Sequence, residues 1–292
     1  MHDIDSSLYN IMLGKSLNYL SSNRRKIAGL HQVKNSETNL HQLHIPDGES
    51  SGKNFNSSVR STHGSCSSLL VKAIIPVRLA GTKSRLAQVL QPEERVEFTL
   101  KMLTDVVRAV AMAPHVSEIL VITHSSSIID LAHSLDAGTV LEASVEGIDS
   151  AIGKAVELCT NVRDALLVLP VDIPLLTSTD VEVMISLAHG KRALVVAPSR
   201  DEKGTNGLLL KPAGVIQTRF GINSFKLHLD AGLISGVTPK VYRSPTMELD
   251  IDIPRDLAEF VSVERDSDAY RFLVERGINK RLTELVAPLQ VR

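Results

Sequence analysis

One basic segment of the sequence has the side chains needed to hold a polyphosphate. Residues 78–86 bring Arg78, Lys83 and Arg85 together with Gly81 and Ser84, directly after an apolar run. Backbone N–H groups and hydroxyls can donate to phosphate there, while Lys and Arg neutralise its charge. The segment matches neither G-x-x-x-x-G-K-[ST] nor G-x-G-x-x-G, so it is neither of these standard phosphate loops. An ordinary exposed basic turn is the alternative.

Two acidic segments, far apart along the chain, each precede a proline. Asp172 follows an apolar run and precedes Pro174, whereas Asp250 and Asp252 precede Pro254. Carboxylates are the usual protein ligands of Mg²⁺. Strand-like alternation would put Asp250 and Asp252 on one side, so that one or both could complete a site begun by Asp172. The alternative is that these aspartates only cap the helices that follow.

Two further segments combine glycine with small polar residues. Residues 204–207 set Thr205 and Asn206 between two glycines, which lets a ligand approach the backbone closely. These side chains suit a carboxylate or the edge of a base. Further on, Asn223 or Ser224 begins a predicted helix, whose free N–H groups attract anions. A plain helix cap is the alternative.

Apolar runs of the sequence predict the elements that position these residues. Short β-branched or aliphatic runs predict buried strands at 71–75, 119–123, 165–169 and 193–197. Helical spacing follows Pro92 and returns at 128–131, and the capping-box pattern Thr179–Glu182 predicts a helix that stops at Gly190. Strands that are apolar throughout and separated by helices indicate a parallel sheet covered on both faces. We therefore expect a single doubly wound, mostly parallel α/β domain over residues 70–292, with ligands bound beyond the carboxyl ends of its strands.

The first 69 residues differ in composition from the rest of the chain. They contain 14 Ser, 7 Asn and five of the ten histidines, with few aliphatic runs. Such a segment buries too little apolar surface to offset its ordering entropy. We expect a mostly disordered extension, with one helix-spaced apolar stretch near residues 8–20.

The composition excludes several classes of protein. The 292 residues hold 32 Lys and Arg against 33 Asp and Glu, and aromatics make up only 3%. A nucleic-acid partner is therefore not expected, because duplex binding needs a basic face and single-strand binding needs stacking residues. Cys66 and Cys159 cannot form a disulfide framework, and no apolar run reaches the roughly 20 residues that span a bilayer. The composition is typical of a cytoplasmic protein.

Set in order, the motifs A-G-T-K-S-R-L, V-L-P-V-D-I-P-L-L, G-T-N-G, F-G-I-N-S-F and L-D-I-D-I-P-R-D-L resemble a known family. They are similar to the 2-phospho-L-lactate guanylyltransferases of coenzyme F-420 biosynthesis, over residues 70–265. This family belongs to the nucleotidyltransferase group that includes the molybdenum-cofactor guanylyltransferase. The resemblance implies a fold like that of the nucleotide-diphospho-sugar transferases, a homodimer, and a downstream transferase that takes the unstable product.

The resemblance also implies roles for individual residues. Lys83, Ser84 and Arg85 would bind the GTP triphosphate, in a loop shaped by Arg78 and Gly81. Asp172 and Asp252 match the positions that carry magnesium, with Asp250 a close alternative. The pocket for the small phosphorylated acid would be formed by Thr205, Asn206, Gly221 and Ser224. One departure is that Ala80 precedes Gly81 where the wider group has a Gly-Gly pair, and residues 1–69 have no counterpart.

The implied reaction needs no general base. A phosphate oxygen of 2-phospho-L-lactate, phosphoenolpyruvate or 3-phosphoglycerate would attack the α-phosphorus of GTP and expel pyrophosphate. Such a phosphate has a second pKa of about 6 and is mostly dianionic near neutrality. In agreement, no histidine falls in the loops 76–86, 170–176 or 248–254. The alternatives are another nucleotidyltransferase, acting on a sugar phosphate or molybdopterin, and a silent nucleotide-binding scaffold.

Overall fold

The computed structural model describes residues 69–79, 81, 83–141, 148–157, 159 and 165–286. Backbone contacts divide the chain into two units, Met1–Cys66 and Ser67–Arg292, and every described residue belongs to the second. The expected disordered extension therefore lies outside the described residues, apart from Leu69. Within the described ranges, no helix combines the length and apolar character needed to cross a membrane.

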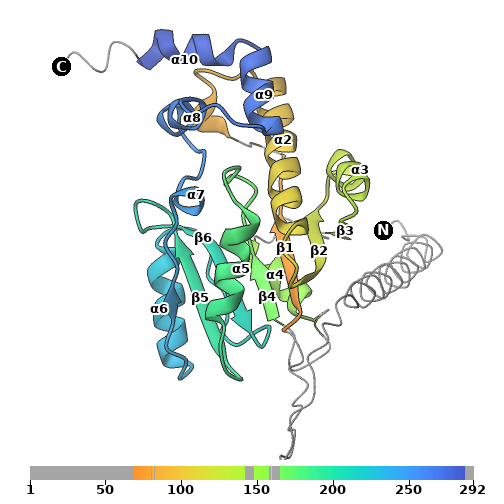
Figure 1. The fold of residues 1–292 in the computed structure, drawn as a ribbon, viewed down its shortest axis with the longest axis vertical. Helices are drawn as coiled ribbons and strands as arrows, with labels where there is room; N and C mark the ends of the chain where they lie inside the picture. The colour runs from red at the N-terminus through yellow and green to blue at the C-terminus, as the bar shows by residue number, and fades with distance from the viewer. Residues whose placement is uncertain are drawn as a thin grey trace, which may run out of the picture. The chain divides into compact units, whose positions relative to one another are not determined.

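A seven-stranded sheet forms the centre of the domain, in the order β3-β2-β1-β4-β6-β5-β7 (Figure 1). β6 is antiparallel to β4 and β5, and the other neighbouring pairs are parallel. The mostly parallel sheet is thus confirmed, and the four predicted strands correspond to β1, β2, β4 and β5. The strands are β1 (Val71–Pro76), β2 (Val116–Thr123), β3 (Gly138–Leu141), β4 (Ala165–Val168), β5 (Ala193–Pro198), β6 (Thr205–Lys211) and β7 (Lys240–Val241).

The helices begin where local capping chemistry allows. α2 starts at Pro92 as predicted, and the Glu94 carboxylate accepts the Gln91 N–H at 2.8 Å. The predicted capping box at Thr179–Glu182 is wrong by two residues, because Thr177 and Asp180 form the box that begins α5. The described helices are α2 (Pro92–Ala111), α3 (Ser126–Ser134), α4 (Ile148–Glu157), α5 (Ser178–Leu187), α6 (Ser224–Ile234), α7 (Pro245–Glu248), α8 (Pro254–Val261), α9 (Asp268–Glu275) and α10 (Ile278–Val286), with a 3₁₀ turn η1 (Ser84–Leu86).

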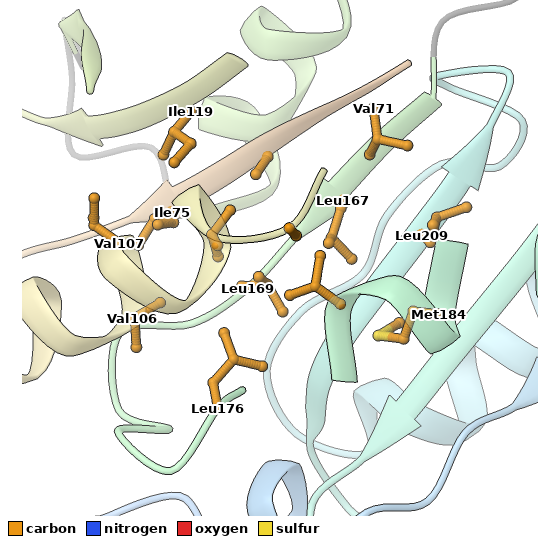
Figure 2. Packing of buried hydrophobic residues seen from close by; sticks show 14 of the residues in the cluster. Val71, Ile75, Val106, Val107, Ile119, Leu167, Leu169, Leu176, Met184 and Leu209 are labelled. Atoms are coloured by element: carbon orange, nitrogen blue, oxygen red, sulfur yellow. The ribbon is translucent and has the colours of Figure 1, made fainter. Parts of the chain in front are cut away.

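Helices cover both faces of the sheet. On one face, Val71 and Ile75 of β1 belong to a buried cluster with residues of α2, α3 and α5 (Figure 2). On the other face, Ile74 belongs to a second cluster with residues of α4 and α6. Burying one such side chain contributes about 1.5–3 kcal/mol, so both layers are needed for stability. The doubly wound arrangement is confirmed.

A third apolar cluster lies at one end of the sheet, where α8, α9 and α10 surround the first half of α2 (Figure 1). It contains Leu86, which ends the basic segment, and Phe98 of α2. It also contains Leu249 and Ile251, which alternate with the two C-terminal aspartates. The basic segment and the second acidic segment are therefore anchored in the same core.

We predict that Leu86→Ala lowers the free energy of unfolding by about 3 kcal/mol, the usual cost of emptying a leucine site. Leu86 has no exposed surface, whereas Leu70 is 56% exposed. Urea denaturation of Leu86→Ala and of the matched control Leu70→Ala measures the difference, and the control should lose less than about 0.5 kcal/mol. Equal losses in the two variants would contradict this view of the third cluster.

The order of the strands marks where a ligand belongs. From β1 the sheet extends through β2 to β3 on one side, and the chain then returns to add β4 on the other side. The carboxyl ends of β1 and β4 therefore meet at the point where the winding reverses, which is where open α/β sheets bind ligands. The basic segment follows β1 and Asp172 follows β4.

Candidate active site

Lys83 lies between two carboxylates that are distant in the sequence. Its Nζ is 2.8 Å from Asp172 Oδ2 and 2.8 Å from Asp252 Oδ1. The lysine side chain is only 6% exposed, whereas those of Asp172 and Asp252 are 24% and 45% exposed. The expected convergence of the basic and acidic segments is thus confirmed.

The backbone fixes this arrangement from both sides. Lys83 has φ 49° and ψ 37°, a left-handed conformation that is costly for a residue with a side chain. Its carbonyl accepts the Leu86 N–H at 2.8 Å, which starts η1. On the acidic side, the Ile251 N–H donates to the Asp172 carbonyl at 2.9 Å, so the two acidic segments are joined directly.

Burial alternates along the segment that carries Asp250 and Asp252, as expected for residues that share one side, although the segment is not a strand. It follows α7 and leads into α8, so its aspartates are not at a strand end as we expected. Leu249 and Ile251 are buried in the third cluster, which turns the alternate residues the other way. Apolar anchoring therefore does here what sheet pairing would do in a strand.

The aspartates are not the caps of the helices that follow. The α5 start is capped by Thr177 and Asp180 rather than by Asp172. At α8, the Asp256 carboxylate accepts the N–H groups of Asp252 and Ile253 at 3.0 and 2.9 Å. Capping therefore does not explain the side chains of Asp172 and Asp252, which instead contact Lys83.

The electrostatics of the site favour an added cation. Burial alone would lower the pKa of Lys83, but the adjacent Asp172 and Asp252 carboxylates outweigh it and raise that pKa. Burial, with the charges of Asp172 and Asp252, raises the pKa of Asp250 from 3.8 to about 6, against the hydrogen bond from Asn206. Lys83 thus contacts two of the three carboxyl groups, and the exposed Arg85 adds one further positive charge 4.0 Å from Asp252, so the negative charge is only partly compensated.

We predict that Asp250→Asn stabilises the protein at pH 7.5 when no divalent cation is present. The folded-state pKa of about 6 lies above the ordinary 3.8, so ionised Asp250 opposes folding above about pH 6 and does not below 3.8. In full the shift is worth about 3 kcal/mol, and partial exposure reduces the expected gain to about 1–2 kcal/mol. Thermal unfolding at pH 7.5 and pH 4 measures the gain, which should shrink to about a fifth at the lower pH. Asp230→Asn is the control, and an undiminished gain at pH 4 would contradict the cause.

The donor set fits a hard divalent cation such as magnesium. Asp172, Asp250 and Asp252 offer carboxylate oxygens only, the ligand type that magnesium prefers. Within the described part of the chain, no three acidic, His or Cys side chains already surround one point. Lys83 Nζ occupies the position from which a cation would contact both Asp172 and Asp252.

The rest of the basic segment lies near this cluster. Arg85 is 74% exposed, and its Nη1 lies 4.0 Å from Asp252 Oδ2. Ser84 is exposed at the start of η1, and Gly81 is exposed with a φ of 67° that favours glycine. Arg78 is half-buried two residues beyond β1. The segment therefore presents exposed donors beside the buried Lys83.

A β-bulge separates two residues that the sequence analysis grouped together. Ala197 of β5 pairs with Gly207, but the next residue, Pro198, pairs with Thr205. β6 therefore carries one extra residue at this point. Such bulges redirect side chains and are common near active sites. Here Thr205 and Asn206 make contacts with different parts of the protein.

Asn206 contacts the acidic segment. Its Nδ2 donates to the Met247 carbonyl at 2.9 Å and lies 3.4 Å from Asp250 Oδ1. Gly207 leaves room for this arrangement, because a Cβ there would lie 2.6 Å from Met247 Cε. Asn206 thus belongs with the carboxylates rather than with Thr205.

Thr205 contacts α6 instead. Ser224 Oγ donates to Thr205 Oγ1 at 3.2 Å, so these two side chains are in contact. The buried His228, which the sequence did not single out, places Nδ1 3.0 Å from the same oxygen. Gly221 has φ 112°, is exposed, and precedes α6 by three residues. Asn223 is the N-cap residue of α6, although its side chain makes no capping hydrogen bond, and Ser224 is the first residue of the helix.

The chain matches the family model described as "Guanylyl transferase CofC like" over residues 71–287. The protein belongs to the CofC-like guanylyltransferase family. The match covers almost the whole described domain and confirms the family that the motifs indicated. The chain is thus a guanylyltransferase, and the other nucleotidyltransferase types are not needed to explain it.

Two relatives of this guanylyltransferase carry names that specify an acceptor. A phosphoenolpyruvate guanylyltransferase from Rubrobacter xylanophilus is 36% identical over 190 residues, which are 64% of this chain and 92% of the relative. A 2-phospho-L-lactate guanylyltransferase from Methanothermobacter thermautotrophicus is 33% identical over 202 residues, which are 69% of this chain and 88% of the relative. Both relatives are therefore matched over most of their length.

The fold of the family member is also found among solved structures. A crystal structure assigned to the nucleotide-diphospho-sugar transferases, from Desulfovibrio desulfuricans G20, aligns with a TM-score of 0.59 at 14% identity. The alignment covers 73% of this chain and 97% of the chain in the crystal structure. The expected relationship to the nucleotide-diphospho-sugar transferase fold is confirmed.

Proposed function

We propose that this guanylyltransferase joins GMP from GTP to the phosphate of a small phosphorylated three-carbon acid, as a step of coenzyme F-420 biosynthesis. The acids named for its relatives, 2-phospho-L-lactate and phosphoenolpyruvate, are the first candidates, with 3-phosphoglycerate a third. The observation that carries the proposal is Lys83, 2.8 Å from each of two carboxylates where the strand order reverses. Such a site could hold a metal cation at the carboxylates beside side chains that donate hydrogen bonds to phosphate.

The nucleotide half of the site would use the basic segment. An oxygen of the acceptor phosphate attacks the α-phosphorus of GTP, the bond from that phosphorus to the bridging oxygen breaks, and pyrophosphate leaves. Lys83, Ser84 and Arg85 would bind the triphosphate, with Arg78 and Gly81 shaping the loop. These groups offset the repulsion between two anions and hold the reacting atoms in line. No proton has to be removed from the acceptor.

We propose that Asp172, Asp250 and Asp252 hold magnesium with the nucleotide. The ion would add positive charge to the phosphates, which is the usual role of Mg²⁺ in phosphoryl and nucleotidyl transfer. Asn206 would orient the Asp250 carboxylate through its 3.4 Å contact. Lys83 would exchange its contacts with the carboxylates for contacts with the triphosphate.

The acceptor acid would bind where Thr205, rather than Asn206, makes its contacts, next to the start of α6. The Thr205 hydroxyl and the Gly221 N–H are donors suited to a carboxylate, and the Ser224 hydroxyl, which donates to Thr205, would hold that side chain in place. Among the described residues, none accepts the Gly221 N–H, and the backbone there is exposed. A carboxylate held at these groups would leave the acid's phosphate to face the nucleotide.

The test is pyrophosphate release by the purified protein with magnesium, each of the four nucleoside triphosphates, and each of the three acids. A downstream transferase is included to trap an unstable product. The expected result is release that requires GTP and one of the acids. A preference for CTP or UTP, or no release with any acid, would contradict the proposed reaction.

The remaining expectations rest on the family resemblance. We propose that the protein acts as a homodimer in the cytoplasm. Light scattering of the purified protein and fractionation of the source cells test the two statements. A monomer at assay concentration would contradict the first, and recovery in the membrane fraction would contradict the second.

A further inference from the structure

A buried histidine joins the two segments proposed to hold the acceptor acid. His228 of α6 has no exposed surface. The Arg219 N–H donates to its Nε2 at 3.0 Å, and its Nδ1 lies 3.0 Å from Thr205 Oγ1. The Phe220 ring packs against the imidazole edge, with centroids 4.9 Å apart. One ring therefore contacts both the start of β6 and the loop before α6.

These contacts fix the tautomer of the ring. Because Nε2 accepts the Arg219 N–H, a neutral imidazole must carry its proton on Nδ1 and donate it to Thr205. Burial lowers the pKa of His228 to about 4, against the opposing charge of Asp149. The ring is therefore neutral at physiological pH, which agrees with this tautomer.

The tautomer sets the direction of the Thr205 hydroxyl. Thr205 Oγ1 accepts from His228 and also from Ser224 at 3.2 Å. A hydroxyl oxygen has two lone pairs, so both are then occupied and the hydroxyl can act further only as a donor. Within the described residues no acceptor is recorded for that proton, although Thr205 is only 6% exposed. A buried donor of this kind favours an anionic partner.

The same ring holds the loop that carries Gly221. The Arg219 N–H is satisfied by His228 and the Phe220 N–H by the Asp149 carboxylate, at 3.0 and 3.2 Å. Two consecutive backbone donors are thus pinned, and Gly221 follows with the left-handed φ of 112°. The next N–H along the chain is therefore held at a fixed place relative to Thr205.

We propose that His228 is a positioning residue for the acceptor acid: it makes the Thr205 hydroxyl a donor and holds the loop that carries the Gly221 N–H, so that both bind the acid's carboxylate. The inference rests on the proposed function and deepens it. His228 itself touches neither substrate. Its effect should therefore appear in the KM of the acid and not in the KM of GTP.

Three substitutions separate the two contacts of the ring. His228→Leu removes both contacts and should raise the KM of the acid about 30-fold, since two hydrogen bonds of about 1 kcal/mol each are lost. His228→Asn keeps a donor near the Nδ1 position and should recover part of that loss. His228→Gln keeps only an acceptor near the Nε2 position and should recover less. Leu229→Ala, on the same helix and packed against the second cluster, is the control for general destabilisation.

A double-mutant cycle tests whether His228 acts through Thr205. In the Thr205→Val background, His228→Leu should raise the acid KM by a smaller factor than in the wild type, because the contact with Thr205 is already absent and only the contact with Arg219 is lost. ¹⁵N NMR of the histidine rings of the full chain gives a readout that does not depend on turnover. It should identify one neutral ring protonated at Nδ1 that is lost in His228→Leu.

The outcomes distinguish the inference from the proposed function. If wild-type protein turns over none of the acids, the proposed function fails. If the wild type is active, the inference is overturned by an unchanged acid KM in His228→Leu, by an equal rise in the KM of GTP, or by an equal effect of Leu229→Ala. A ring protonated at Nε2 would overturn it as well.

Discussion

Asp172→Asn should abolish guanylyl transfer and leave the protein folded. Asparagine keeps the shape of the side chain and can still accept the Lys83 hydrogen bond, now 2.8 Å long, but it removes the negative charge. Loss of the charge proposed to hold magnesium should cost several kcal/mol of transition-state stabilisation, so we expect kcat to fall on the order of 10³-fold or more. Pyrophosphate release at saturating GTP and acid measures the loss.

Folding and specificity controls accompany this variant. Its free energy of unfolding should stay within about 1 kcal/mol of wild type, because Asp172 is partly exposed and Lys83 keeps Asp252 as a partner. Asp266→Asn makes the same chemical change at a side chain that is 92% exposed, and it should leave kcat unchanged. Activity of Asp172→Asn within tenfold of wild type would remove Asp172 from the site.

Lys83→Met should have the second largest effect, and on both activity and stability. Without the ammonium, the Asp172 and Asp252 carboxylates keep only the exposed Arg85, 4.0 Å from Asp252, as a compensating charge, and we expect a loss of about 2 kcal/mol in stability. Without one of the two positive charges proposed to bind the triphosphate, kcat/KM for GTP should fall on the order of 10²- to 10³-fold. Thermal unfolding and initial rates measure the two losses.

Two matched variants identify the cause of those losses. Lys83→Arg keeps the charge and should recover most of the stability, but not full activity, since a planar guanidinium does not replace an ammonium at this position. Lys191→Met removes an exposed lysine outside the site and should change neither quantity. If Lys83→Met retains wild-type kcat/KM for GTP, the basic segment does not bind the triphosphate.

The buried part of the fold was predictable because its strands are uninterrupted runs of apolar residues. β1, β2, β4 and β5 are apolar on both faces, and helical periods separate them, so the doubly wound sheet followed directly. β6 was not expected, because its first residues are the polar, glycine-flanked 204–207 and its reversed direction depends on the β5 and β4 neighbours. The start of α5 was misplaced because two capping-box patterns overlap at Thr177–Glu182, and only packing selects one.

The charged half of the site was also predictable, because the rule about strand ends needs no knowledge of side-chain contacts. It brought Lys83 and Asp172 together, and the structure gives them a 2.8 Å contact. The neutral half was harder to predict. The extra residue in β6 sends Asn206 toward Asp250 and Thr205 toward His228, and no pattern in the sequence indicates a bulge at that position.

The third apolar cluster makes the spacing of the charges depend on the end of the chain. Leu86 and Ile251 hold Lys83 and Asp252 at their separation only while α8, α9 and α10 remain packed around them. Local opening of these helices would spread the charges apart without melting the central sheet. Heat inactivation should therefore occur at a lower temperature than global unfolding. Deletion of the residues after 262 should likewise inactivate the enzyme and leave the central sheet folded.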